Sequence, residues 1–306
     1  MRLAAIDIGS NAARLLISDI TTYKDGSLDF TKVNLVRVPL RLGFDVFDTG
    51  SISDKKKTEL LETIKAFKHL MNVYEVKGLK VCATSAMRDA TNSPQIVHEV
   101  FKATGVQINI ITGSEEAQIL YETHLAETMD SHNMYLYIDV GGGSTEITFF
   151  GKNKQVLKRS FDVGTIRLLK NKVTDTTWDE MKAYVKSIKS TLPLVAIGSG
   201  GNINKVFSLS KRKPGKPLNA EILREYYKEI GALSVQDRIH KYGFREDRAD
   251  VIVPALQIYT CIMRWADIDE IYVPQIGLAD GLIKLLYQEM SFTSLMGVEK
   301  NKASLT

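Results

Sequence analysis

The chain has 306 residues, of which 44% are hydrophobic and 25% charged. This composition is typical of a soluble globular protein and argues against a disordered chain, a fibre or a membrane bundle, and the length allows two domains of ordinary size. The net charge of +4 gives no indication of nucleic-acid binding, and two distant cysteines, Cys82 and Cys261, exclude a disulfide framework and a cysteine metal site.

The first half of the chain alternates between apolar runs of strand length and helical patterns. Two short runs on either side of the turn GSN predict a hairpin, and Ser53 opens an amphipathic pattern that predicts a capped helix. Alternating strands and helices predict an α/β layer. The expected strands are 1–7, 13–20, 33–42, 79–83 and 106–111, and the expected helices are 52–73, 94–104 and 115–125.

The second half repeats this plan. Asp139, its three following glycines and the strand 146–150 mirror Asp7, GSN and the strand 13–20, at an offset of 132 residues. Two similar domains that face each other would place these two turns across one cleft. The other expected elements are strands 134–139, 195–197 and 271–273, helices 178–192, 220–233, 247–265 and 281–289, and a polar end at 291–306.

The location is predicted from two absences. The longest apolar run without a charge, 251–263, is too short to span a bilayer. The amino terminus has no extended apolar signal region and enters an expected strand at once. We therefore expect a cytoplasmic protein without membrane contact.

The stretch YIDVGGGSTEI contains the parts of a phosphate site. Glycines let the backbone approach a ligand and adopt positive φ, so that successive N–H groups converge on phosphate oxygens. Ser144 and Thr145 add hydroxyl donors, and Asp139 at the end of a strand can hold a divalent cation. A tight hairpin explains one such turn equally well. Two turns at domain spacing favour a cradle for phosphate and magnesium.

Three glycine-containing loops carry a resemblance. DIGSN at 7–11, DVGGGSTE at 139–146 and GSGGN at 198–202 resemble, in order, the two phosphate loops and the third glycine loop of the actin, sugar-kinase and heat-shock-chaperone ATPase superfamily. ATSAMRDATN at 83–92 and ITGSEEAQ at 111–118 make the chain similar to the exopolyphosphatase and guanosine pentaphosphate phosphohydrolase (Ppx/GppA) family.

The resemblance, which is strong over about the first 150 residues, implies an α/β fold of two similar ribonuclease H-like domains with an interdomain cleft. One domain would comprise 1–123 together with a C-terminal helix at about 286–300, and the other 124–285. Longer family members carry further C-terminal helical domains, and this sequence ends before them. A long polyphosphate channel built with those domains is therefore not expected.

The resemblance also implies the catalytic and metal-binding residues. In the family the general base is a glutamate of the GxEEA motif, which matches Glu116 here, with Glu115 as the alternative. Asp7, Asp139 and Glu146 would complete an acidic group. Such carboxylates share a cleft with an anionic substrate only if their charge is neutralised, because two like charges ~4 Å apart repel by about 4 kcal/mol at an effective dielectric of ~20. Mg²⁺ is the expected cofactor.

The phosphate-binding residues come from the same motifs. Arg88 resembles an arginine that the family directs at phosphate, and its forked donors suit bidentate contact; a surface ion pair with Asp89 is the alternative. Arg14 and Arg41 are two further candidates to reach the cleft. The other expected phosphate ligands are Ser10, Asn11, Gly141, Gly142, Gly143, Ser144 and Thr145.

The most basic segment is 205–217, KVFSLSKRKPGKP. A solvated loop is one interpretation, and a track for a polyanion that leaves the cleft is the other. The salt dependence of binding would separate them, since phosphate contacts weaken steeply with salt.

The expected function is a Mg²⁺-dependent hydrolase that releases terminal orthophosphate from inorganic polyphosphate by general-base activation of water. The alternative substrate is guanosine pentaphosphate. An ATP-dependent phosphotransferase and a non-enzymatic sensor share the loops, but the glutamate of GSEEA favours hydrolysis. The resemblance further suggests a homodimer.

Overall fold

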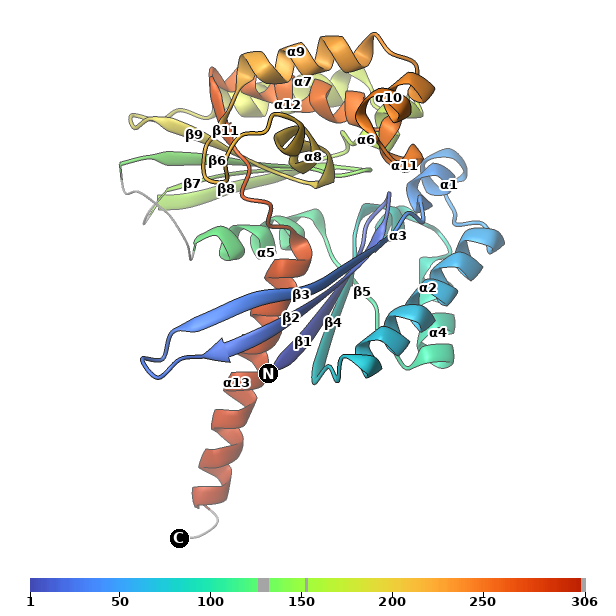
Figure 1. The fold of residues 1–306 in the computed structure, drawn as a ribbon, viewed down its shortest axis with the longest axis vertical. Helices are drawn as coiled ribbons and strands as arrows, with labels where there is room; N and C mark the ends of the chain where they lie inside the picture. Colours follow the sequence, from blue (N-terminus) through green and yellow to red (C-terminus); the bar gives the residue numbers. More distant parts are fainter. Residues whose placement is uncertain (126–131, 152–153, 304–306) are drawn as a thin grey trace.

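The computed structural model describes residues 1–125, 132–151 and 154–303, and the side chains of 1–120, 132–151 and 157–292. The chain forms two mixed sheets with helices packed on their faces (Figure 1). The first sheet has the order β3-β2-β1-β4-β5, in which β1, β2 and β3 are antiparallel neighbours and β4 and β5 run parallel to β1. Its strands are β1 (Arg2–Ile8), β2 (Ala13–Thr22), β3 (Leu28–Val38), β4 (Gly78–Ala83) and β5 (Asn109–Ile110).

The second sheet repeats this arrangement with one added edge strand. Its order is β10-β11-β9-β6-β7-β8, in which β6, β7 and β8 form the antiparallel meander and β9 and β11 continue in parallel. The predicted α/β fold with two similar ribonuclease H-like lobes is therefore confirmed. The strands are β6 (Met134–Val140), β7 (Thr145–Gly151), β8 (Lys154–Phe161), β9 (Leu194–Ser199), β10 (Leu218–Asn219) and β11 (Glu270–Tyr272).

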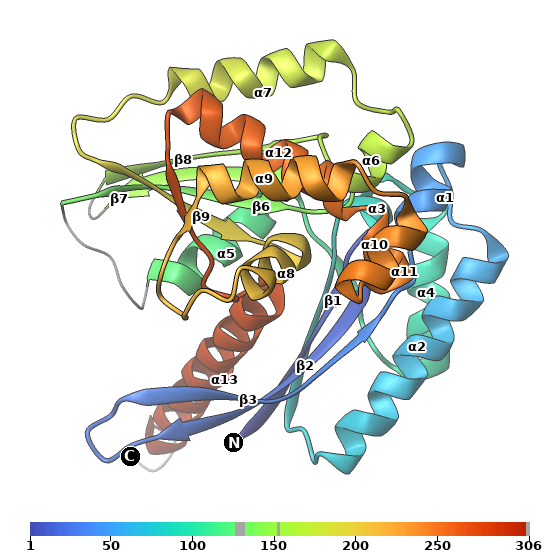
Figure 2. The same cartoon turned by 45° about the horizontal axis from the view of Figure 1, so that its top comes forward.

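The helices cover the outer faces of the sheets and fill the space between them. Figure 2 shows α7, α9 and α12 on the outer side of the second sheet. The helices are α1 (Leu42–Thr49), α2 (Asp54–Val73), α3 (Ser85–Asp89), α4 (Ser93–Thr104), α5 (Gly113–Leu125), α6 (Thr165–Leu169), α7 (Asp175–Ser187), α8 (Gly201–Leu209), α9 (Ala220–Gly231), α10 (Val235–Tyr242), α11 (Glu246–Ala249), α12 (Ile252–Ala266) and α13 (Leu278–Ala303).

A shared apolar cluster joins the two lobes. Leu120 of α5 and Leu282 of α13 are buried with Leu3 of the first sheet and with Tyr137 and Phe150 of the second. Each sheet also has a core of its own on its outer face. Because α5 and α13 pack against both sheets and protein interiors are close-packed, these two helices set the separation of the sheets. The acidic end of α5 is thereby positioned between the lobes.

Several predicted boundaries differ from those observed. The strand expected at 33–42 is β3 and ends at Val38, because Arg41 adopts the left-handed conformation (φ 56°) and α1 begins at Leu42. The helix expected at 247–265 divides into α11 and α12 around Asp250. The basic strand β8 was not predicted, because KQVLKRSF lacks an apolar alternation. The last helix continues to Ala303 rather than ending at 289, and the boundary at 123/124 stays a prediction.

None of the helices in the described parts of the chain combines the length and the hydropathy that a membrane span requires.

Candidate active site

A cleft between the two sheets collects the three glycine-containing loops. The first loop contributes Asp7, Ser10 and Asn11, and the second contributes Asp139, Gly141, Gly142 and Ser144. Ser199, Gly200, Gly201 and Asn202 of the third loop line the same cleft, as does Glu116 at the start of α5. The two aspartate-led turns therefore open onto one space, as the internal repeat predicts.

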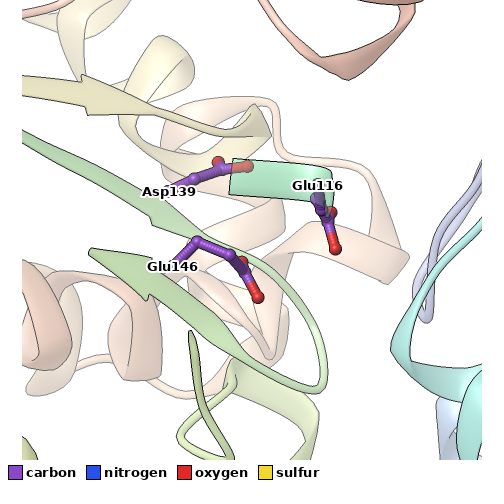
Figure 3. Close-up of side chains that lie close together, drawn as sticks. All are labelled: Glu116, Asp139 and Glu146. Carbon is purple, nitrogen blue, oxygen red and sulfur yellow. The ribbon is translucent and has the colours of Figure 1, made fainter. Parts of the chain in front are cut away.

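Three carboxylates meet beside this cleft (Figure 3). Asp139 at the end of β6 and Glu146 at the start of β7 are directly opposite each other in the antiparallel pair, so their side chains share one face. Glu116 approaches from α5. One oxygen of each carboxylate lies within 4.8 Å of the others. At that separation, each pair of charges repels by about 3–4 kcal/mol at an effective dielectric of ~20.

Burial raises the pKa of all three groups, and nearby negative charges raise it further. Burial is the largest cause for each of them, and it raises the pKa of Asp139 to about 6 and that of Glu146 to about 7. The pKa of Glu116 is also raised, by burial and then by the negative charges of Glu146 and Asp139. These carboxyl groups therefore keep their protons to a higher pH than ordinary carboxyl groups do, and a bound cation would favour their ionised forms.

The donor set suits a hard divalent cation. Glu146 is 1% exposed and accepts hydrogen bonds from the hydroxyls of Ser144 (2.7 Å) and Ser160 (2.9 Å), which fix its orientation. The Oε2 atom of Glu116 is buried and has no hydrogen-bond partner among the described residues. A cluster of carboxylate oxygens with an unpartnered member has the chemistry that Mg²⁺ prefers. Sequence reasoning left open that Glu146 faces solvent, and its burial excludes that alternative.

The two candidate bases have different environments. Glu115 is exposed, and its carboxylate accepts hydrogen bonds from the backbone N–H (2.7 Å) and the hydroxyl (2.8 Å) of Thr112, while its own N–H donates to that hydroxyl. This reciprocal arrangement is a capping box at the start of α5. The same bonds lower the pKa of Glu115. Glu116 is 8% exposed and lines the cleft, so the geometry favours Glu116 for chemistry and Glu115 for capping.

Asp7 lies apart from the carboxylate cluster. It is 5% exposed and accepts a hydrogen bond of 2.6 Å from the guanidinium of Arg14, its direct neighbour across β1 and β2. The prediction grouped Asp7 with Asp139 and Glu146 around one metal. Because Arg14 already neutralises Asp7, this aspartate holds an arginine at the cleft, and direct metal ligation by it stays a prediction.

The glycines of the second loop permit a close approach between the loops. A Cβ on Gly142 would lie 2.8 Å from the Cβ of Ser10, so a side chain there would separate the lobes. Gly141, Gly142 and Gly143 do not have the positive φ that the sequence suggested. In the third loop Gly200 has φ 117°, a conformation that favours glycine.

The hydroxyl and amide candidates divide into two groups. Ser144 lines the cleft, as do Ser10, whose hydroxyl lies 2.7 Å from that of Ser85, and Asn11, whose amide donates to the backbone oxygen of Asp247 (3.0 Å). Thr145 is fully buried, and its hydroxyl donates to the backbone oxygen of Val163 at 2.5 Å. Thr145 and Gly143 do not line the cleft, and this buried bond indicates a structural role for the threonine hydroxyl.

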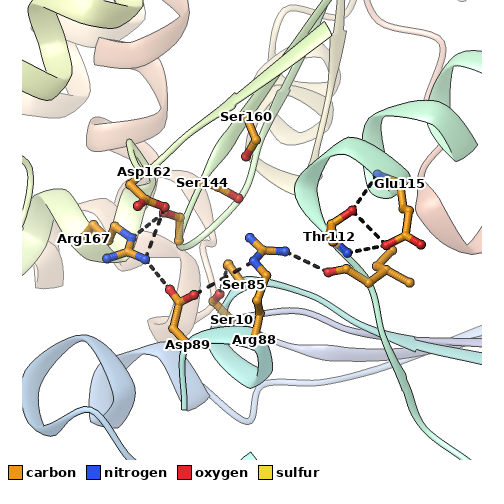
Figure 4. Close-up of polar contacts among 12 residues, drawn as sticks. Ser10, Ser85, Arg88, Asp89, Thr112, Glu115, Ser144, Ser160, Asp162 and Arg167 are labelled. Atoms are coloured by element: carbon orange, nitrogen blue, oxygen red, sulfur yellow. Dashed lines mark hydrogen bonds and ion pairs between the residues drawn. The ribbon is translucent and has the colours of Figure 1, made fainter. Parts of the chain in front are cut away.

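Arg88 of α3 points toward the start of α5 (Figure 4). Its guanidinium donates to the backbone oxygen of Ile111 (2.9 Å) and is 3.9 Å from Asp89, a weak ion pair. Its positive charge counteracts the raised pKa of Glu116 and of Glu146. Arg88 is therefore close enough to influence the carboxylates without lining the cleft itself.

Three arginines line one side of the cleft, and the sequence did not predict them as a group. Arg14 and Arg37 are directly opposite each other on β2 and β3, and Arg248 of α11 joins them from the second lobe. Burial and the neighbouring guanidinium groups lower the pKa of both Arg37 and Arg248, while Asp247 pairs with Arg37 at 2.5 Å. The register of β3 was the missing signal, since it alone places Arg37 beside Arg14. Arg41 instead pairs with Asp250 and does not line the cleft.

Comparisons with known proteins agree with this geometry. The model of the Ppx/GppA phosphatase family matches residues 20–289. The chain is 26% identical over 318 aligned residues to exopolyphosphatase 1 of Mycobacterium tuberculosis, which covers 97% of this chain and 91% of that protein. It is 23% identical over 297 residues to a putative exopolyphosphatase of Haemophilus influenzae, which covers 92% of this chain and 88% of that protein.

Solved structures share the fold. An exopolyphosphatase of Cytophaga hutchinsonii superposes with a TM-score of 0.81 at 23% identity, over 94% of this chain and 98% of the other. A Ppx/GppA family member of Aquifex aeolicus gives a TM-score of 0.72 at 24% identity over the same shares. The family resemblance inferred from the sequence motifs is thereby confirmed, and the chain belongs to the Ppx/GppA phosphatase family.

Proposed function

We propose that this phosphatase removes the terminal phosphate of inorganic polyphosphate by hydrolysis of its phosphoanhydride bond. The observation that carries the proposal is the position of Glu116: a buried carboxylate with one unpartnered oxygen borders a cleft that is lined by glycine loops and arginines. A cleft of this kind attracts a chain of phosphates, and relatives over nearly the full length are named exopolyphosphatases.

Glu116 acts as the general base. Hydrolysis of a phosphoanhydride requires a positioned water and a group that accepts its proton. As the water oxygen bonds to the terminal phosphorus, Oε2 of Glu116 takes the proton, and the bond between that phosphorus and the bridging oxygen breaks. Burial, the largest cause of the raised pKa of Glu116, makes its ionised carboxylate a stronger base.

Asp139 and Glu146 would hold the divalent cation, with the hydroxyls of Ser144 and Ser160 keeping Glu146 in place. When bound, a divalent cation supplies charge neutralisation to the phosphoryl oxygens and permits the carboxylates to stay ionised. Mg²⁺ is the proposed ion, because only oxygen donors are present in the cluster.

The arginines hold the rest of the phosphate chain. Arg14, Arg37 and Arg248 line the cleft, and guanidinium groups bind phosphate oxygens through paired donors. Arg88 would act on the terminal phosphate from the side of the carboxylates. The backbone of the glycine loops, with Ser10 and Ser144, supplies further donors.

Guanosine pentaphosphate is the second candidate substrate, and one observation favours it. Leu35 is 55% exposed on β3 and lines the cleft together with the partly buried Ile276. A bare phosphate chain has no use for this apolar surface, whereas a nucleoside can pack on it.

The test measures release of orthophosphate from inorganic polyphosphate and from guanosine pentaphosphate, side by side with Mg²⁺ and with a chelator. We expect Mg²⁺-dependent release with a higher kcat/KM for polyphosphate. A preference for the nucleotide would make the second candidate the function, and no release from either would exclude both. The homodimer and the cytoplasmic location inferred from the sequence stay predictions.

A further inference from the structure

We propose that a basic strip on the second lobe binds the part of a polyphosphate chain that extends beyond the cleft. The inference rests on the proposed function and assigns a place to the distal phosphates. The strip runs from the cleft along α8 into the loop that follows it, and it consists of Arg248, Lys205, Lys211, Arg212, Lys213 and Lys216.

The strip is continuous with the active-site cleft. Gly201 opens α8 in the cleft wall, and a Cβ on it would lie 3.5 Å from Nη2 of Arg248 and 3.7 Å from Nη2 of Arg14. Lys205 lies four residues later and therefore on the same face of the helix. Its ammonium is 5.7 Å from the centre of the Phe244 ring, close to the start of α11, which carries Arg248. The cations thus follow α8 out of the cleft.

The loop after α8 presents four more cations to solvent. The nine residues of α8 span about 13 Å from Gly201, which lines the cleft, to Leu209. Lys211 then adopts the left-handed conformation (φ 54°), its N–H bonds to Ser208, and the N–H of Lys216 bonds to the oxygen of Lys213. These backbone bonds order the turn while Lys211, Arg212, Lys213 and Lys216 remain exposed.

The positive charge of α8 and of the loop after it is not compensated locally. Residues 201–219 contain five cations and no carboxylate. Their charge of +5 exceeds the net charge of the whole chain, which is +4. In the described parts of the chain, no carboxylate lies within ion-pair distance of Lys205, Lys211, Arg212, Lys213 or Lys216. Crowded cations without carboxylate partners repel one another, so this cluster does not stabilise the fold.

The chemistry favours a bare polyanion over a nucleic acid. Single-stranded nucleic acids are bound by cations interleaved with aromatic faces that stack on the bases. Phe244, the ring beneath Lys205, is 4% exposed and stacks on Tyr242, so it offers no face to a base. A row of cations that leads out of a phosphate cleft fits a chain made of phosphates only.

The experiment compares two variants of equal charge. The strip variant carries Lys211→Ala, Arg212→Ala, Lys213→Ala and Lys216→Ala, all at exposed positions. The control variant carries Lys55→Ala, Lys102→Ala, Lys182→Ala and Lys189→Ala, four exposed lysines on α2, α4, α7 and the segment after it. Because both variants lose four positive charges, a difference between them reports position rather than net charge.

Binding and hydrolysis of long-chain polyphosphate and of tripolyphosphate are measured across a range of salt concentrations. For the strip variant we expect affinity for the long chain to fall on the order of tenfold or more at low salt, and the slope of log affinity against log salt to become shallower by about 3, at roughly 0.7 per lost phosphate contact. Hydrolysis of tripolyphosphate, which does not leave the cleft, should be unchanged.

Several outcomes would overturn the strip. These are an equal loss in the control variant, an equal loss for tripolyphosphate, or no change for the long chain. A loss of single-stranded RNA binding that exceeds the loss for polyphosphate would assign the strip to nucleic acid instead. If the unmodified protein hydrolyses neither phosphate chain, the proposed function fails, while the binding measurement still decides whether the strip holds polyphosphate.

Discussion

The two aspartate-led hairpins have the same backbone plan and opposite charge at one position. In the first lobe Asp7 is directly opposite Arg14, seven residues later, and in the second lobe Asp139 is directly opposite Glu146, also seven residues later. The first pair forms an ion pair of 2.6 Å, whereas the second places two carboxylates together beside Glu116. One lobe neutralises its aspartate internally, and the other requires a proton or a cation.

Because of this difference, the two lobes present side chains of opposite charge at the cleft. The arginine of the first lobe is held by its own aspartate and remains available to phosphate, since it lines the cleft. The glutamate of the second lobe is held by two serine hydroxyls and remains available to a cation. Under the proposed function, a duplicated fold would therefore supply a group for the substrate from one copy and a group for the cation from the other.

The largest expected effect concerns Glu116, which completes the acidic site of the second lobe. Glu116→Gln keeps the shape of the side chain but removes the base, so kcat should fall by roughly 100-fold or more while polyphosphate still binds. Glu115→Gln is the matched control, because this neighbour caps α5 and does not line the cleft. Single-turnover rates of both variants would decide. A loss with Glu115→Gln and none with Glu116→Gln would reverse the assignment.

The next effect tests the ion pair of the first lobe. Arg14→Ala leaves the nearly buried Asp7 without its partner, so we expect the free energy of unfolding to fall by about 1–3 kcal/mol, less than for a fully buried pair because the Arg14 side chain is 31% exposed. KM for polyphosphate should rise roughly tenfold through the loss of a charge-assisted contact.

The double variant Arg14→Ala, Asp7→Asn separates these two consequences. It removes the unpaired carboxylate, so part of the stability should return while KM stays high. Urea denaturation and steady-state kinetics are measured on the parent protein, on Arg14→Ala, on Asp7→Asn and on the double variant. If the free energy of unfolding stays low in the double variant, the unpaired carboxylate of Asp7 is not the cause of the lost stability.

The sequence predicted more of the site than of its surroundings. Local patterns were sufficient for both hairpins, for the Ser53 cap of α2, and for the meeting of the two aspartate loops at one cleft. Local patterns could not place Arg37 beside Arg14, because that position depends on the register of β3 against β2, which shifts between Ile17 and Ser18. The bond from the Thr145 hydroxyl to a backbone oxygen 18 residues away is likewise a consequence of packing, which no local pattern encodes.

A smaller effect concerns the repulsion in the second lobe. The pKa of Glu146 is raised to about 7 from its ordinary value of 4.5, so the folded protein binds more protons than the unfolded chain between these pH values. Stability of the metal-free protein should therefore be greatest below about pH 4.5 for this group and decrease by about 1–3 kcal/mol as the pH rises towards 7.

Glu146→Gln removes that dependence and provides the control. With a chelator present, the variant should unfold at a higher denaturant concentration than the parent at pH 7 and show a flatter pH profile. Added Mg²⁺ should stabilise the parent at pH 7 and have a smaller effect on the variant. A parent protein whose metal-free stability rises from pH 5 to 7 in step with the variant would contradict the repulsion.

The smallest effect tests whether the second lobe depends on the orientation of α5, which brings Glu116 to it from outside its own sheet. Thr112→Ala removes the hydroxyl of the capping box and should cost about 1 kcal/mol in unfolding free energy. Ser53→Ala removes an equivalent cap from α2, which lies away from the cleft, and should cost about the same. Only the first should also lower kcat, by a few-fold, because the start of α5 sets the direction of Glu116. Equal kcat values for the two variants would mean that the apolar packing of α5 around Leu120 is sufficient to orient Glu116.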